Sequence, residues 1–131
     1  MKKIFFLFSL FMILSCSSSN DSASSSDFNP PAWIQGTWKQ DYGTGSGNSF
    51  SFTKNDICVT IYTGGGQCQQ ASIDFVRKGG LTVKVTETIT STFYSAKADY
   101  SNGQSVTYAF NKISNTSIEW TAVSGVEFIK Q

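Results

Sequence analysis

Histidine is absent from this 131-residue chain, and cysteine and proline are scarce, with three and two residues. Because histidine is the commonest general base and metal ligand near neutral pH, its absence excludes most familiar active sites and metal centres. Charge is also limited: ten basic side chains stand against nine acidic ones, without the basic excess typical of nucleic-acid binding. The sequence therefore favours one compact, non-enzymatic domain with no metal, cofactor or nucleic-acid partner.

The first fifteen residues are apolar out of proportion to the rest. Lys2 and Lys3 precede an apolar run over residues 4–14, which Ser15 and Cys16 close. A run of about 11 residues is too short to span a hydrocarbon core of about 30 Å as a helix, so a cleaved export signal is expected. Without the two lysines, eight basic side chains remain against nine acidic ones, and the mature chain is close to neutral.

The end of this run, Ile13-Leu14-Ser15-Cys16, resembles the bacterial lipoprotein signal. The resemblance implies a signal peptide over residues 1–15 and a mature chain that begins at Cys16 with acyl chains on its thiol and amine. Two or more such chains anchor a protein firmly in a membrane. Ser17 follows instead of the Asp that favours inner-membrane retention, which implies the outer membrane, at its periplasmic face or the cell surface. The alternative is an ordinary secretory signal with an incidental cysteine.

Small polar residues dominate the next stretch, SSSNDSASSSD over residues 17–27. They bury too little apolar surface to become ordered, so residues 16–31 are expected to form a flexible tether with a reach on the order of 20 Å. Within it, Asp21-Ser22-Ala23 resembles the O-glycosylation site of some Gram-negative exported proteins. The folded domain is expected over residues 32–131.

From residue 32 onward, apolar and polar residues alternate in short runs that Gly, Asn and Asp interrupt. This two-residue period is typical of strands with one buried face, and no apolar set at 3.6-residue spacing is long enough to predict a helix. Nine strands are predicted, over residues 33–40, 49–53, 57–62, 67–77, 81–89, 92–100, 104–112, 117–121 and 126–130.

Hairpin signals join these strands, most clearly Asn102-Gly103 and then Gly79-Gly80. Sequential hairpins predict an antiparallel meander, and short strands hide their edges best when the sheet closes on itself. The predicted fold class is therefore all-β, a small up-and-down barrel of about eight strands. Its interior is expected to hold large apolar side chains: Ile34, Trp38, Phe50, Phe52, Ile73, Phe75, Tyr108, Phe110, Ile118, Trp120 and Phe128.

The three cysteines are explained by one acylated residue, Cys16, and one pair, Cys58 and Cys68. Three consecutive glycines, 64–66, lie between the paired cysteines and allow the chain to reverse. In the oxidising periplasm this arrangement favours a cross-strand disulfide over a metal site, for which histidine and further cysteines are missing.

The first predicted strand contains a Gly-x-Trp element, Gly36-Thr37-Trp38, and residues 50–57, 114–120 and 128–130 follow in order. With these segments the exported domain resembles the lipocalin-like domains of bacterial lipoproteins. In that family the glycine lets the first strand bend at the barrel floor and the tryptophan plugs the closed end. The resemblance also implies a basic side chain over Trp38, for which Lys130 and Lys112 are the candidates.

The function implied by this resemblance is a membrane-anchored protein that binds a small apolar or amphipathic ligand in the barrel mouth. The side chains expected to line the interior, mostly as core and partly as ligand contacts, are Phe50, Phe52, Tyr108, Phe110 and Trp120. The alternative is a protein-interaction module, such as an inhibitor of lysozyme or another hydrolase, or a surface contact protein. Such a module would use exposed tyrosines, and the candidates are Tyr42, Tyr62, Tyr94 and Tyr100.

Two further features are expected to be ordinary surface. The glycine-rich stretch over residues 42–48 lacks the Lys-Ser/Thr ending of a phosphate-binding loop, so it is interpreted as a mobile loop, and as a lid if the barrel mouth is open. Four carboxylates, Asp74, Glu87, Asp99 and Glu119, are scattered over different predicted strands and show no spacing typical of a catalytic pair. The sequence leaves the oligomeric state open.

Overall fold

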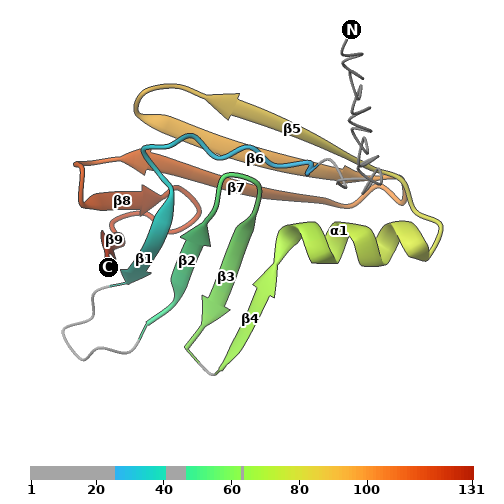
Figure 1. Ribbon diagram of the computed structural model, residues 1–131, viewed down its shortest axis with the longest axis horizontal. Helices are drawn as coiled ribbons and strands as arrows, with labels where there is room; N and C mark the ends of the chain where they lie inside the picture. Colours follow the sequence, from blue (N-terminus) through green and yellow to red (C-terminus); the bar gives the residue numbers. More distant parts are fainter. Residues whose placement is uncertain (1–25, 41–46, 63) are drawn as a thin grey trace, which may run out of the picture.

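The computed structural model describes residues 26–40, 47–62 and 64–131 (Figure 1). Cys16, residues 21–23, Tyr42 and most of the glycine-rich loop lie outside them. Within the described residues the chain forms nine strands and one helix. They are β1 (Gly36–Gln40), β2 (Ser49–Phe52), β3 (Ile57–Ile61), β4 (Gly65–Cys68), α1 (Gln69–Lys78), β5 (Val83–Ile89), β6 (Phe93–Tyr100), β7 (Ser105–Lys112), β8 (Ser117–Trp120) and β9 (Glu127–Lys130).

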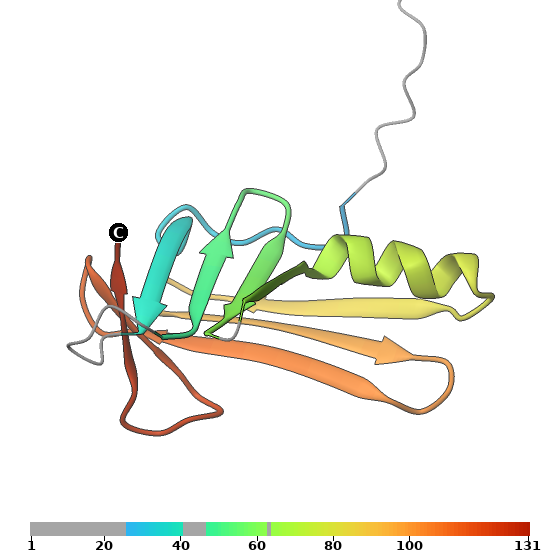
Figure 2. The same cartoon turned by 90° about the horizontal axis from the view of Figure 1, so that it is seen from below.

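All nine strands belong to one antiparallel sheet with the order β4-β3-β2-β1-β9-β8-β7-β6-β5. Strands that follow one another in the chain are neighbours in the sheet, except β4 and β5, and the last strand pairs with the first, with Trp38 opposite Lys130. The sheet curls into a half-barrel (Figure 1 and Figure 2). The predicted all-β, up-and-down meander is therefore confirmed. The β6–β7 hairpin turns at Asn102-Gly103 as expected, with Gly103 at a φ of 87° that favours glycine.

The predicted strand over residues 67–77 is wrong for most of its length, because the chain leaves β4 at Cys68 and continues as α1. Gln69, Ile73 and Val76 recur at the spacing of one helix face, and this face turns inward. Gly79 ends the helix, with its N–H donating to the Phe75 carbonyl. Since a helix separates them, β4 and β5 do not pair, and they form the two edges of the sheet.

Phe75 is the one expected interior residue that the helix turns outward, with an exposed fraction of 77%. In a strand, Ile73 and Phe75 would share one face because side chains alternate with a period of two. In a helix, two residues are about 200° apart, so burial of Ile73 forces Phe75 to the outside. The exposed ring is thus a direct consequence of the change from strand to helix.

Phe50 lies at the centre of the core, on the concave side of the sheet. Its ring contacts five other aromatic rings at centroid distances of 4.9 to 6.3 Å, mostly edge to face. This geometry suits the ring quadrupoles. The other large side chains that are fully buried come from the segment before β1, from β1, β3 and α1, and from the last four strands: Pro30, Ile34, Trp38, Ile57, Ile73, Tyr94, Phe110, Ile118 and Phe128.

Trp38 lies fully buried at one end of the half-barrel, where its indole N–H donates to the Ile34 carbonyl over 2.6 Å. The Lys130 ammonium lies 5.0 Å from the ring centroid, which agrees with the expected basic side chain from the last strand. Lys112 instead lies over Trp33. Gly36 has a φ of 122°, and a Cβ there would lie 3.0 Å from Cε of Lys130. A glycine at position 36 therefore lets Lys130 cover Trp38.

The packed part of the chain begins before residue 32, where the sequence places the start of the domain. Phe28 and Pro30 are buried, and the segment over residues 26–35 runs across the half-barrel to β1 (Figure 1). The backbone N–H of Asn29 donates to Glu87 of β5, and the Trp33 indole donates to the Thr90 carbonyl just beyond it. Among the described residues, no helix is long and apolar enough to cross a membrane.

The contrast between Phe50 and Phe75 gives a matched test of this packing. Phe50→Ala removes the central ring of the core, and we expect it to lower the free energy of unfolding by about 3 to 5 kcal/mol. Phe75→Ala removes a ring of the same size from the surface of α1 and should change it by about 0.5 kcal/mol at most. Urea unfolding monitored by tryptophan fluorescence measures both. Equal losses for the two variants would contradict the assignment of Phe50 to the core and Phe75 to the surface.

Candidate binding groove

Two hollows adjoin each other beside α1: the smaller, of about 390 Å³, is lined by β4 and α1, and the larger, of about 610 Å³, lies between α1 and the far ends of β6 and β7. They share Gln67, Ser72 and Val76, and we treat them together as the α1 groove. Pockets that hold small molecules usually measure about 300 to 1,000 Å³, so each hollow is large enough for a ligand. The groove lies beside the gap between β4 and β5, where the sheet stops short of closing.

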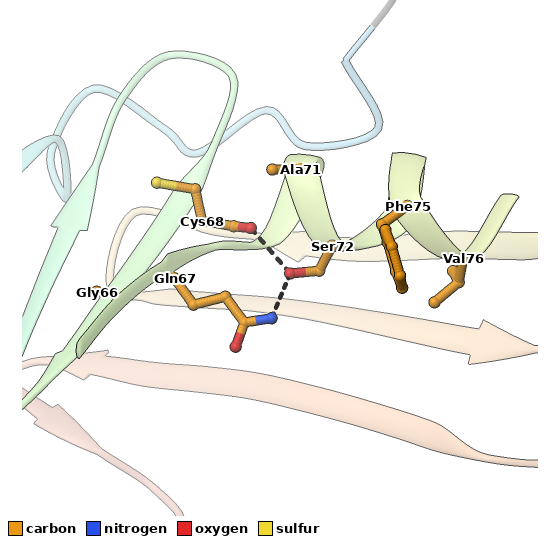
Figure 3. A pocket seen from close by; sticks show the side chains of 7 residues that line it. All are labelled: Gly66, Gln67, Cys68, Ala71, Ser72, Phe75 and Val76. Atoms are coloured by element: carbon orange, nitrogen blue, oxygen red, sulfur yellow. Dashed lines mark hydrogen bonds between the residues drawn. The ribbon is translucent and has the colours of Figure 1, made fainter. Parts of the chain in front are cut away.

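One wall of the α1 groove comes from β4 and α1. Figure 3 shows Gln67, Phe75 and Val76 pointing to the same side, toward β6 and β7. The Gln67 amide donates to the Ser72 hydroxyl over 2.6 Å, and this hydroxyl donates to the Cys68 carbonyl over 3.0 Å. Because Gln67 donates within the wall, its side-chain carbonyl is directed to the groove as an acceptor.

The predicted disulfide between Cys58 and Cys68 is confirmed, and it holds this wall in place. It joins β3 to β4 at a directly paired position, with the two Cα atoms 3.9 Å apart. Cys68 is also the residue from which α1 begins. The crosslink therefore fixes both the last residue of β4 and the start of the helix relative to the sheet.

The opposite wall comes from the end of the β6–β7 hairpin and the start of the β5 segment. It consists of Leu81, Tyr100, Gln104, Ser105 and Val106. Val106 is 39% exposed, and Tyr100 is half-buried. The tight Asn102-Gly103 turn fixes the spacing of this wall, since it connects Tyr100 directly to Gln104, whose carbonyl accepts a hydrogen bond from the Tyr100 N–H.

Every side chain that lines the α1 groove is uncharged. Amides and hydroxyls on both walls offer donors and acceptors, while Val76, Leu81, Phe75 and Val106 offer apolar surface. Such a lining suits a neutral ligand with both apolar and hydrogen-bonding parts, because an unpaired charge would lose hydration without gaining a partner.

Neither protein-family models, nor curated proteins, nor solved structures match this chain. The properties of the α1 groove therefore rest on its own geometry.

The aromatic residues expected to line a ligand site lie inside the half-barrel but away from the α1 groove. Phe50, Phe52 and Phe110 are buried and pack against one another. Tyr108 and Trp120 are half-buried against the same cluster. Burial, together with neighbouring Tyr100, raises the pKa of Tyr108, so its hydroxyl stays protonated. None of the five lines the two hollows.

The expected patch of exposed tyrosines does not form, because Tyr94 is fully buried. Tyr94 faces inward on β6, and its hydroxyl donates to Glu87 over 2.7 Å. Burial and this hydrogen bond raise the pKa of Tyr94 far above its ordinary value, which keeps it a donor. Tyr62 is 68% exposed, and Tyr100 lines the groove.

The four scattered carboxylates each have a different neighbour. Asp74 accepts from Gln70, Asp99 pairs with Lys97 at 2.8 Å, and Glu119 accepts from the Gly125 N–H. Potential metal ligands of the described residues gather at one place, where Asp56 lies beside Cys58 and Cys68. Both sulfurs are bonded to each other, so only the Asp56 carboxylate remains to bind a cation there.

Sequence reasoning identified Tyr100 as a recognition residue but missed most other groove residues. Gln67, Ser72 and Val76 were assigned to a strand, and Gln104 and Ser105 are ordinary polar residues next to a turn. The spacing of Gln69, Ile73 and Val76 was the one available signal, since it fits a helix that could form a wall.

Asp27 binds α1 through Gln70 near the start of the helix and through Arg77 near its end. Arg77 donates to both Asp27 carboxylate oxygens over 2.6 and 2.8 Å, and also to the Val83 carbonyl of β5. Gln70 donates to Asp27 and accepts from its backbone N–H. The Arg77 hydrogen bonds, opposed in part by burial, lower the pKa of Asp27. The N-terminal segment thus connects α1 to β5.

We expect this connection to weaken in acid. Because folding lowers the pKa of Asp27, its stabilisation is complete above the ordinary aspartate pKa of 3.8 and is lost as the pH falls below it. Asp27→Asn should remove about 1 kcal/mol of stability at pH 7 and flatten the dependence on pH below 4. Asp99→Asn, which breaks an ion pair about half exposed on both sides, is the control and should have little effect. Urea unfolding between pH 2 and 7 measures both, and equal pH profiles for Asp27→Asn and the unchanged chain would contradict the expectation.

Proposed function

We propose that this chain is a lipid-anchored, non-enzymatic binding protein of the bacterial outer membrane that holds an uncharged amphipathic ligand in the α1 groove. The observation that carries this proposal is the groove itself, whose two hollows of about 390 and 610 Å³ are lined only by uncharged side chains. The dense aromatic core leaves the α1 side of the half-barrel as the better candidate for a ligand than the space around Phe50.

Binding is favoured over catalysis by the chemistry of the groove. Its lining contains hydroxyls and amides but no carboxylate, lysine or arginine, and the chain has no histidine. The Ser72 hydroxyl donates to a carbonyl and accepts from an amide, so no base beside it takes its proton. Groups that hold a ligand are thus present, whereas a nucleophile with its base is missing from the lining.

The proposed anchor rests on the lipoprotein-like signal that ends at Cys16. The described chain begins ten residues later, and the segment over residues 26–35 starts on one side of α1, near its first turn, and runs from there toward β1 (Figure 2). The groove side chains Gln67, Phe75 and Val76 point to the other side of α1. A tether from Cys16 would therefore join the domain away from the open side of the α1 groove.

Replacement of the acylated cysteine tests the anchor. Cys16→Ala should move the protein out of the outer-membrane fraction, because the thiol that carries the acyl chain is gone. Ser17→Ala, a change at the next residue, should leave it there. Membrane fractionation and mass spectrometry of the mature N-terminus measure the effect, and an unmodified Cys16 thiol in the unchanged protein would overturn the proposed anchor.

A charge placed in the groove tests ligand binding. The mature chain over residues 16–131 carrying Cys16→Ser is titrated with N-phenyl-1-naphthylamine, an uncharged amphipathic dye. Val106→Asp should weaken dye binding by about tenfold or more, because the new carboxylate lies against the apolar part of the ligand. Val123→Asp is the matched control, since Val106 and Val123 are 39% and 41% exposed and only Val106 lines the groove. Equal affinities for the two variants would show that the dye binds elsewhere.

A second candidate function, contact with another protein, is favoured by Phe75. This ring is 77% exposed and lines the smaller hollow, where it offers a large apolar contact at the edge of the groove. A protein segment seated in the α1 groove would bury it.

A further inference from the structure

The free edge of β4 runs along the smaller hollow of the α1 groove. β4 pairs with β3 on one side, and no strand of the described residues lies on its other side. Gly66, Gln67 and Cys68 of this strand line the hollow together with residues of α1. A free strand edge presents backbone N–H and C=O groups that can pair with an added strand.

The pairing of β4 shows which of its backbone groups face the hollow. In an antiparallel ladder, pairs with close Cα atoms are the ones that do not exchange hydrogen bonds. Cys58 and Cys68 form such a pair, with Cα atoms 3.9 Å apart. Because the two kinds of pair alternate, Gly66, opposite Thr60, belongs to the same kind. Its N–H and C=O therefore point away from β3, toward the free edge.

Both edges of the sheet are covered in part: Ser72 donates to the Cys68 carbonyl of β4, and three side-chain or N-terminal contacts lie along β5. Arg77 donates to the Val83 carbonyl, Asn29 donates to the Glu87 side chain, and Trp33 donates to the Thr90 carbonyl. Along the described chain, no residue outside β3 makes a hydrogen bond to the backbone of Gly65 or Gly66. Proteins usually protect an edge with charge or proline, but residues 64–68 contain neither.

We propose that the α1 groove takes an uncharged peptide segment in extended conformation, which pairs with the free edge of β4 at Gly66. The inference deepens the proposed function and rests on it, since it names the ligand class of the same groove. The partial charges are complementary: the N–H and C=O of Gly66 face the C=O and N–H of the added strand. Gly65 and Gly66 carry no side chain that would hinder its approach.

The walls of the groove suit the side chains of such a segment. Alternate side chains of an added strand point to opposite faces, and those on the concave side enter the space bounded by Val76, Tyr100 and Val106. Gln67 and Gln104 lie on opposite walls and can bond to peptide groups, since amides donate and accept. Phe75 covers the strand from α1, which explains why a large ring is exposed there.

Amide hydrogen exchange at Gly66 tests the pairing directly. The probe is a pool of capped pentapeptides built from Ser, Thr, Asn, Val and Tyr, added to the ¹⁵N-labelled mature chain, residues 16–131, carrying Cys16→Ser. A hydrogen bond to the added strand should slow exchange of the Gly66 N–H by about tenfold. The Ser114 N–H, which already donates to the Ser117 carbonyl at the turn between β7 and β8, does not line the groove; it is the control and should not change.

The same peptides with N-methylated backbones are the matched control for the ligand, because they keep every side chain and lose the backbone donors. Strand addition is supported if the first pool slows exchange of the Gly66 N–H and the N-methylated pool leaves that exchange rate unchanged. Equal binding of both pools, or displacement of the dye without any effect at Gly66, overturns it while the proposed groove stands. If the dye binds and the peptides do not change its binding, the inference is also overturned. If neither the dye nor the peptides bind, the inference and the proposed function are overturned together.

Discussion

The helical conformation of the ten residues of α1, between β4 and β5, is the constraint on which the other features of this protein depend. A helix rises about 1.5 Å per residue, so ten helical residues extend about 15 Å, whereas ten residues of a strand would extend about 33 Å. A strand would also offer backbone groups for pairing along its whole length, which the helix does not. With α1 in this place the meander joins its ends through β1 and β9 but stays open between β4 and β5. The helix then runs beside the far ends of β5, β6 and β7 and forms a wall of the groove (Figure 2).

The sizes of the inward side chains explain why one end of the half-barrel is filled and the other is hollow. Along β7 the inward residues change from Phe110 to Tyr108 to Val106, and along β6 they change from Tyr94 to two alanines. The large rings gather around Phe50 and Trp38 at the filled end. Ala96, Ala98 and Val106 are too small to fill the space up to α1, so packing leaves the groove there, with Tyr100 at the end of β6 as part of its wall.

Most of the strands could be predicted from the sequence because several of them alternate plainly and are bounded by recognisable turns such as Asn102-Gly103. The disulfide followed from counting cysteines. The prediction of a strand over residues 67–77 failed because the apolar residues there fit two periods. Ile73 and Phe75 have the two-residue spacing of a strand, while Gln69, Ile73 and Val76 have the spacing of one helix face. Contacts distant in sequence decide between them, namely the disulfide at Cys68 and the bond from Arg77 to Asp27. The groove depends on this helix, so its walls could not be predicted either.

The two edges of the sheet differ because the N-terminal segment covers only one of them. Asn29 and Trp33 bind beside β5, and Asp27 holds the end of α1 against it through Arg77. The same segment therefore lies against β5 and on the side of α1 away from the groove side chains (Figure 3). A molecule anchored through this segment would present the free edge of β4 away from the point of attachment. That orientation favours a ligand that arrives from solution over a lipid of the same membrane, and a backbone edge favours a peptide among such ligands.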